Sequence, residues 1–242
     1  MAITRGGTTS SFSTSVEGTT GDVSHTVDSG TDLLVLSVSM RANHAVNGTP
    51  QWSLGGGENL TLIHASTSSD LAGDQRQYIY GLISPTVGAG TIDVVIDPAA
   101  PWIFSSAINY IGCDTASVAA ATNFLSEDVN DTNTQTSVHA SAGSSGNALY
   151  FAGCLRGGDG DPSSNASSFT ELFDGGTGAD ATQDGAFYVA DLLDSAPAAI
   201  TVTWAVSDEN ASIYVEIVAA AVGANPKGPL GLPLNGSLAG PI

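Results

Sequence analysis

Two similar series of apolar segments follow one another along this chain, and this internal repeat most limits how it can fold. The segment GTDLLVLSVSMR at Gly30–Arg41 aligns without gaps on SGNALYFAGCLR at Ser145–Arg156. Any two halves of a β protein look somewhat alike, but chance periodicity seldom repeats several elements in order. The repeat therefore predicts two related sets of strands. Further matches follow in order: Leu60–Ile63 with Phe169–Leu172, Tyr78–Ile83 with Phe187–Leu192, Ile92, Val94 and Ile96 with Ile200, Val202 and Trp204, and Ala107–Gly112 with Glu216–Ala221.

The alternation of side chains within these segments is typical of β-strands. In TIDVVID, the residues Ile92, Val94 and Ile96 fall on one face at period two. Glycine occurs 29 times and separates short apolar runs, as it does between strands and tight turns. We predict an all-β fold, a jelly-roll-like β-sandwich whose two sheets pack face to face.

The repeat also suggests how the chain is divided. An alanine-rich stretch at 116–124 could form a helical turn, but no long amphipathic helix is visible. We expect an N-terminal strand or arm at 1–24, the first half of the sandwich at 25–114, a connecting polar loop at 115–144, the second half at 145–223 and an extended arm at 224–242.

The C-terminal arm combines prolines with apolar side chains. Repeated proline blocks helix and central strand alike, so the arm should be extended, and a disordered linker would be more polar. Such an arm can dock into a groove on its own domain or on a neighbour, and we favour a neighbour because apolar terminal arms are a common assembly device. The residues expected to bind the partner are Pro226, Pro229, Leu230, Leu232, Pro233, Leu234, Leu238 and Ile242.

The charge of the chain is strongly unbalanced. The chain has five Lys and Arg residues and 24 Asp and Glu residues, which gives a formal net charge of −19. Nucleic acids and anionic membranes bind through basic patches, so we expect neither as a partner. The start of the chain lacks the apolar stretch of a secretory signal, and no apolar run approaches the roughly 20 residues that span a bilayer. We therefore expect synthesis in a cytoplasm.

No residue pattern predicts catalysis, a metal or a cofactor. The histidines His25, His44, His64 and His139 are not at metal-ligand spacing, and we expect them in turns or at the surface. No G-x-S-x-G motif is present, so we do not expect an enzyme. Cys113 and Cys154 end apolar strands; buried thiols are the favoured interpretation, and a bridge requires that the fold bring these strand ends together.

Two weaker candidate sites deserve a test against the structure. Asp159 and Asp161 in GGDGDP could help bind calcium, although EF-hand spacing is missing and a solvated loop is the favoured interpretation. Trp102 follows Ala-Ala-Pro in an expected loop, which makes it the candidate ligand-contact residue, whereas Trp204 is in register with core positions. With three tryptophans in the chain, a sugar-stacking groove is not expected.

The order of the motifs resembles a known group of structural proteins. After SGTDLLVLSVSMR come a W-S-L-G-G hairpin at Gln51–Ile63, a strand ending L-I-S-P at Gln77–Pro85, G-x-G-T-I-D-V-V-I at Gly88–Ile96, N-Y-I-G-C-D at Asn109–Asp114 and a second strand opening S-G-N-A-L-Y. This order resembles the two-half, jelly-roll-like β-sandwich proteins of tailed-phage structural regions and of bacterial surfaces. The resemblance covers about residues 25–223. Its motifs are turn glycines and core hydrophobes, which indicate fold more than role.

The resemblance implies a virion protein without a cofactor. In phages such proteins are often head decoration (cement) proteins on the outer capsid surface, made in the host cytoplasm. The expected partners are the major capsid protein, copies of the chain itself, or both, and a homo-oligomer is expected. The alternative is a tail-associated or cell-surface adhesive or carbohydrate-binding module. One departure is the alanine-rich and then acidic segment Thr115–Thr134, where such proteins often have an apolar turn.

Overall fold

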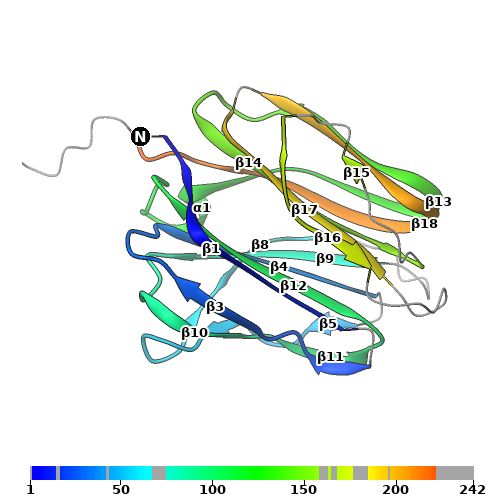
Figure 1. Cartoon of the computed structure of the whole chain (residues 1–242), viewed down its shortest axis with the longest axis horizontal. Coiled ribbons are helices and arrows are strands. Elements are labelled where there is room, and N and C mark those ends of the chain that lie inside the picture. The colour runs from blue at the N-terminus through cyan, green and yellow to red at the C-terminus, as the bar shows by residue number, and fades with distance from the viewer. Residues whose placement is uncertain are drawn as a thin grey trace, which may run out of the picture.

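A computed structural model describes residues 2–14, 17–41, 44–66, 75–157, 163–164, 168–176, 185–195 and 197–221. Most of these residues belong to β-strands, and their one helix is the short α1 (Val118–Ala121) (Figure 1). The predicted all-β fold is confirmed. The arm at 224–242, with all of its expected contact residues, and the candidate calcium ligands Asp159 and Asp161 lie outside the described residues.

Two antiparallel sheets form the centre of the molecule. The first has the order β1 (Thr4–Thr14), β12 (Ile103–Ile111), β4 (Leu33–Arg41), β9 (Gln75–Ile83) and β8 (Thr61–Ala65). The second has the order β13 (Thr122–Ala142), β18 (Ala198–Ile217), β14 (Asn147–Arg156), β17 (Gly185–Ser195) and β16 (Thr170–Gly176), with β15 (Ser163–Ser164) pairing to β18.

The two sheets share one strand order, which confirms the internal repeat. Two of the predicted matches are out of register: Tyr78 corresponds to Tyr188 and not to Phe187. Likewise, Ala107 corresponds to Tyr214 and not to Glu216. β4, β8 and β9 of the first sheet correspond to β14, β16 and β17 of the second, and β12 corresponds to the second half of β18. The remaining strand, β1, corresponds to the first half of β13. We call residues 4–111 the first repeat and residues 122–217 the second repeat. The first repeat thus begins earlier than expected, because β1 belongs to its sheet.

The segment 115–144 was wrongly predicted to be a polar loop. After α1, the chain forms β13, whose first half pairs with the second half of β18 and whose second half pairs with the first half of β18. Ser, Thr, Asn and Asp fill most of this strand. It lies at the edge of its sheet, a position that tolerates polar residues, and its composition therefore resembles that of a loop.

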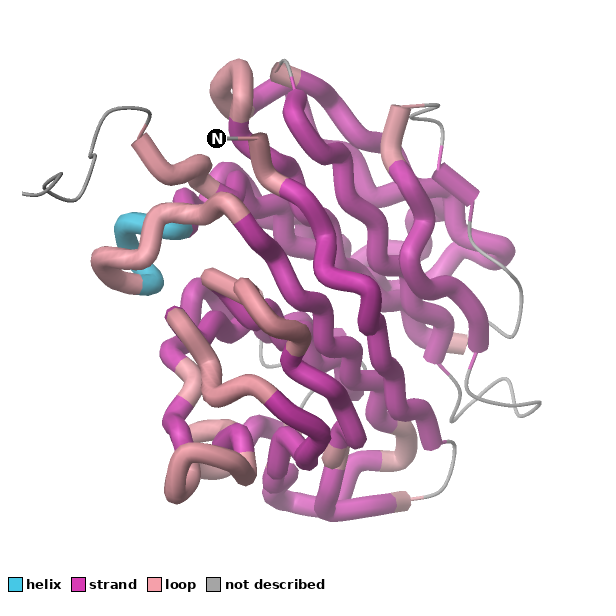
Figure 2. The backbone as a smooth tube through the Cα atoms, turned by 60° about the vertical axis from the view of Figure 1, so that its left-hand side comes forward, coloured by secondary structure: helices cyan, strands magenta, loops and turns pink. Residues whose placement is uncertain are grey.

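An outer layer covers each central sheet, so the repeats stack as four β layers (Figures 1 and 2). In the second repeat, the outer layer consists of β15, the second half of β13 and the first half of β18. In the first repeat, it consists of two small sheets: β3 (Val23–Val27), β10 (Gly88–Asp93), β6 (Gln51–Trp52) and β7 (Glu58–Asn59), then β2 (Gly18–Thr20), β11 (Val95–Ala100) and β5 (Ala45–Val46).

Alternate side chains of each central strand therefore enter different interiors. On β4, Leu33 and Val35 face the other repeat, whereas Leu34 and Leu36 face the outer layer. Strand β14 is arranged in the same way. Both faces are buried, which explains why these strands are almost continuously apolar in the sequence.

The two repeats pack together through a shared apolar interior. Within it, Phe104 of β12 stacks on Phe187 of β17 with ring centroids 3.5 Å apart. The strand order of one sheet runs opposite to that of the other across this interface. The Arg5 guanidinium of β1 accordingly lies 3.0 Å from Asp191 Oδ2 of β17, and β8 of the first repeat contacts β13 of the second.

Candidate functional site

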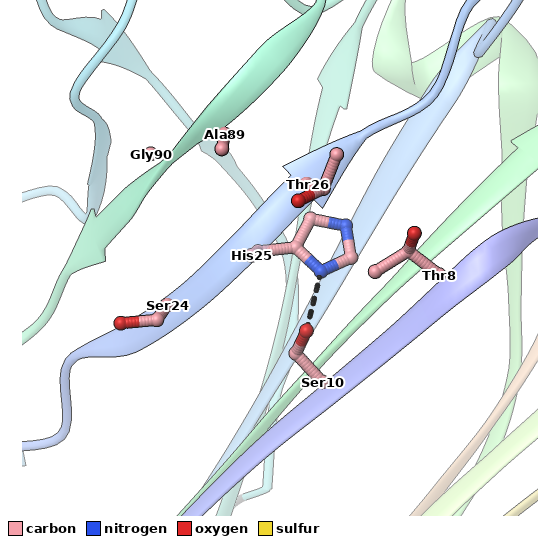
Figure 3. Close-up of a pocket in the computed structure, with 7 residues that line it drawn as sticks. All are labelled: Thr8, Ser10, Ser24, His25, Thr26, Ala89 and Gly90. Carbon is pink, nitrogen blue, oxygen red and sulfur yellow. Dashed lines mark hydrogen bonds between the residues drawn. The ribbon is translucent and has the colours of Figure 1, made fainter.

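A hollow of about 210 Å³ opens between β1, β3 and β10 in the first repeat (Figure 3). The imidazole of His25 projects from β3 toward β1, where its Nδ1 lies 3.0 Å from Ser10 Oγ. The Nε2 atom lies 3.0 Å from Asn109 Oδ1 of β12. The residues that line the hollow are Thr8, Ser10, Ser24, His25, Thr26, Ala89 and Gly90.

The neighbours of Asn109 determine which nitrogen of His25 carries the proton. The amide Nδ2 of Asn109 donates to Thr26 O at 2.9 Å and to Asp28 Oδ2 at 3.0 Å. Its Oδ1 therefore faces His25 and accepts the Nε2 proton. His25 Nδ1 is left with a lone pair that accepts the Ser10 hydroxyl. A serine, a histidine and an orienting amide in this order are the parts of a nucleophilic site.

The second repeat contains a similar contact, made by the buried side chain of His139. There His139 Nδ1 lies 2.7 Å from Ser126 Oγ, and its Nε2 lies 2.8 Å from Ser212 Oγ. Ser10 and Ser126 occupy equivalent places in the repeat, opposite β12 and β18 respectively. Because the contact recurs where the histidine is a core residue, we interpret both contacts as ties between an outer layer and its central sheet.

The expectation that His25 and His139 lie in turns or at the surface was wrong. Both side chains are buried, and His139 is only 1% exposed. Burial lowers the pKa of His25 and lowers that of His139 to about 4, since a desolvated imidazole resists protonation. Both rings are therefore neutral at neutral pH. The sequence signal for burial was alternation, because His25 continues the inward-facing series of Val23 and Val27.

A second hollow, of about 180 Å³, opens between the two repeats, and we call it the seam groove. Leu62 and Phe124, on opposite walls, are 49% and 43% exposed. Sequence reasoning missed this groove because its walls come from different repeats and one of them was expected to be a loop. It is lined by Thr61, Leu62 and Ile63 of β8, Val118 and Ala119 of α1, and Thr122 and Phe124 of β13.

The Phe124 wall of the groove is held in place from β8. The imidazole of His64 stacks on the Phe124 ring, with centroids 3.7 Å apart and planes 18° apart. The same imidazole is anchored by its Nε2, which lies 2.8 Å from Glu127 Oε2 of β13. The groove therefore has a defined shape before any partner binds.

Trp102 does not occupy the exposed loop position expected for a ligand contact. Its side chain is 0% exposed and packs with Cys154 and Ala211 of the second repeat. A Cβ atom added at Gly185 would lie 2.5 Å from the Trp102 Cε2 atom, so the indole lies directly on that glycine. Trp102 belongs to the contact between the repeats, and a glycan cannot stack on it.

The two cysteines are separate, buried thiols. Cys154 Sγ lies 3.7 Å from Arg76 O, and Cys113 forms a β-bridge with Ala219. Burial raises the pKa of each thiol to about 12, so both stay protonated at neutral pH. This confirms the favoured interpretation and settles the open question of a bridge between them.

The described residues contain no cluster of three or more His, Cys, Asp or Glu side chains that could hold a metal ion. None of their helices has the length and hydropathy needed to cross a membrane.

No protein-family model matches the chain, and no curated protein or solved structure is significantly similar to it. The resemblance to phage structural proteins therefore stays a prediction from the sequence.

Proposed function

We propose that this chain is a structural protein of a virion, a head decoration protein that binds the outer surface of a phage-type capsid through its C-terminal arm. The observation that supports this best is the shared interior, which joins two sandwich-like repeats into one body. Such a body can transmit load between attachment points without deforming, because close-packed interiors are poorly compressible.

The internal polar chemistry also supports a structural role. Buried hydroxyl and amide groups of the first central sheet bind one another across neighbouring strands: Ser37 Oγ lies 2.6 Å from Ser106 Oγ, and Ser39 donates to Gln77. Both described hollows are smaller than the roughly 300–1,000 Å³ typical of small-molecule sites. The polar groups stabilise layers, and neither hollow has the size of a substrate pocket.

The distribution of charge explains why attachment would depend on an apolar arm. With a net charge of −19, the protein repels other acidic surfaces. From 222 onward, Lys227 is the only charged residue. The arm can thus approach an acidic surface that the body cannot, and a tethered second contact raises avidity through effective concentration.

Deletion of residues 225–242 tests this proposal on capsids that lack the protein. We expect the deletion to leave the circular dichroism spectrum and melting temperature unchanged and to lower occupancy on the particles, most clearly at high salt. A full-length Asn235→Ser variant serves as the matched control and should bind normally. If the shortened protein occupied particles as fully and as salt-resistantly as the full chain, the arm would not be the attachment device.

A further inference from the structure

We propose that the seam groove binds the C-terminal arm of a second copy of this chain. The inference rests on the proposed function, in which the arm makes the attachment, and it names one surface that the arm recognises. The occupant would be the leucine-containing stretch at 230–234, where Leu230, Leu232 and Leu234 alternate with Gly231 and Pro233.

The seam groove combines apolar side chains with Thr61 and Thr122, and it is large enough for an aliphatic side chain. Six large apolar side chains are exposed in the described part of the chain, and the only two that are not valines, Leu62 and Phe124, line this groove. Its volume of about 180 Å³ compares with roughly 150 Å³ for an engineered apolar cavity that binds benzene. A leucine side chain would fill it and cover both exposed residues.

The groove also lies between two sheet edges. Strand β8 is the last strand of the first central sheet, and β13 is the first strand of the second. An edge strand presents unpaired backbone groups to an incoming extended peptide. An extended arm could therefore add backbone hydrogen bonds to the burial of its leucines.

Three residues before its last described residue, the chain passes α1, the helix that contributes Val118 and Ala119 to the groove. Val218 N donates to Ala121 O at 2.8 Å, and Val218 O accepts from Asp114 N at 3.0 Å, so the last described residues pass the end of α1 (Figure 2). Two copies related by a two-fold axis that passes close to this groove would each place the start of an arm near the other's groove. That geometry allows a reciprocal exchange of arms.

The spacing of the first leucine favours a neighbour's groove over the chain's own. Leu230 follows the last described residue, Ala221, by nine positions, and Pro226 and Pro229 lie within this link. A proline-stiffened link of that length would span about 28 Å at ~3.1 Å per residue. The chain's own groove begins at the adjacent α1, so an extended link would carry the leucines past it.

Self-association of full-length variants tests the inference. We expect the native chain to form an oligomer by sedimentation velocity, and Leu62→Asp, Phe124→Ser and Leu232→Asp each to weaken association at least tenfold. Val206→Asp is the matched control, because Val206 is 38% exposed and does not line the groove. Melting temperatures identify any variant that fails to fold, and Phe124→Ser removes apolar surface from the groove without adding charge.

A mixing experiment distinguishes a second copy from the chain's own arm. Leu62→Asp keeps an intact arm and Leu232→Asp keeps an intact groove, so each alone should be monomeric and an equimolar mixture should form a heterodimer. A native chain that stays monomeric while Leu62→Asp exposes its arm to protease would identify its own arm as the occupant and overturn the proposal. Groove variants that associate normally would also overturn it. Groove variants that are monomeric but still occupy capsids would uphold both this inference and the proposed function. If groove variants associated normally and only the arm deletion abolished capsid binding, the result would support the proposed function and not this inference.

Discussion

At the residue scale, a polar side chain at the start of the middle strand of each central sheet, β4 or β14, makes an equivalent contact in both repeats. Asp32 Oδ2 accepts hydrogen bonds from the backbone N–H groups of Gly112 and Cys113, and Asn147 Oδ1 accepts one from Ala219 N at 2.9 Å. Asp32 and Asn147 are equivalent in the gap-free alignment of the repeats. Each ties the start of its central strand to the chain that follows the neighbouring strand, β12 or β18.

Removing either tie should destabilise the fold by a similar amount. We expect Asp32→Ala and Asn147→Ala each to lower the free energy of unfolding by about 1–3 kcal/mol, because backbone N–H groups lose their partner. Urea denaturation provides the measurement. Asp93→Ala on β10 is the control, since Asp93 is exposed, and it should change stability by less than about 0.5 kcal/mol. Equal losses at all three positions would contradict a specific role for the turn.

The neutral His139 makes stability depend on pH. Because burial lowers its pKa in the folded state to about 4, the unfolded chain binds the extra proton first. The contribution of neutral His139 to the free energy of unfolding is therefore fully present above about pH 6.5. It is lost as the pH falls toward 4, and the total loss is on the order of 3 kcal/mol. Asp191 acts oppositely, because burial raises its pKa to about 6 and its contribution is lost as the pH rises through that value.

Comparison with His139→Gln isolates the histidine term from that of Asp191. Unfolding free energies measured between pH 7 and pH 4 should fall less steeply in the variant, whatever its absolute stability. If native and variant proteins had parallel pH profiles, His139 would not be a buried neutral residue.

At the scale of elements, one glycine sets how closely β17 approaches the end of β12. Gly185 is the first residue of β17. Trp102 comes directly before β12, and its indole lies against Gly185. Gly185→Ala should cost about 1–3 kcal/mol, because a rigid buried indole cannot move aside easily. Gly7→Ala on β1 is the matched control, since an added Cβ there meets no atom within 4 Å. Similar melting temperatures for the two variants would refute this contact.

The elements that could be predicted from the sequence are those buried on both faces. Strands β4, β9 and β14 appeared as apolar runs, and their recurrence gave the repeat. Strand β13 was missed because an edge position permits polar residues that also suit a loop. Trp102 was misplaced because its neighbours Ala-Ala-Pro suggest a turn, while its burial depends on Gly185, a distant residue. The seam groove could not be predicted, since it exists only where two repeats meet.

At the scale of the whole molecule, three apolar interiors alternate with four layers of strands. Two interiors each lie within one repeat, and the third lies between the repeats. The third interior includes Phe104 and Tyr110 of the first repeat and Phe187 and Ile213 of the second. Opening it would expose a large apolar face on each central sheet, which is costly at ~25 cal/mol per Å². Neither repeat should therefore unfold alone.

Tryptophan fluorescence can test this coupling, because each repeat carries its own buried reporter. Trp52 lies in the interior of the first repeat and Trp204 in that of the second. We would measure variants that keep only Trp52 or only Trp204, with the other tryptophans replaced by Phe. In each variant, we expect the fluorescence transition to occur at the same denaturant concentration as the far-UV circular dichroism transition of that variant. Coincident transitions are the mark of two-state unfolding. If the Trp52 and Trp204 signals separated from circular dichroism in opposite directions, the repeats would be independent domains that merely touch, and the rigid body on which a capsid-binding role depends would not exist.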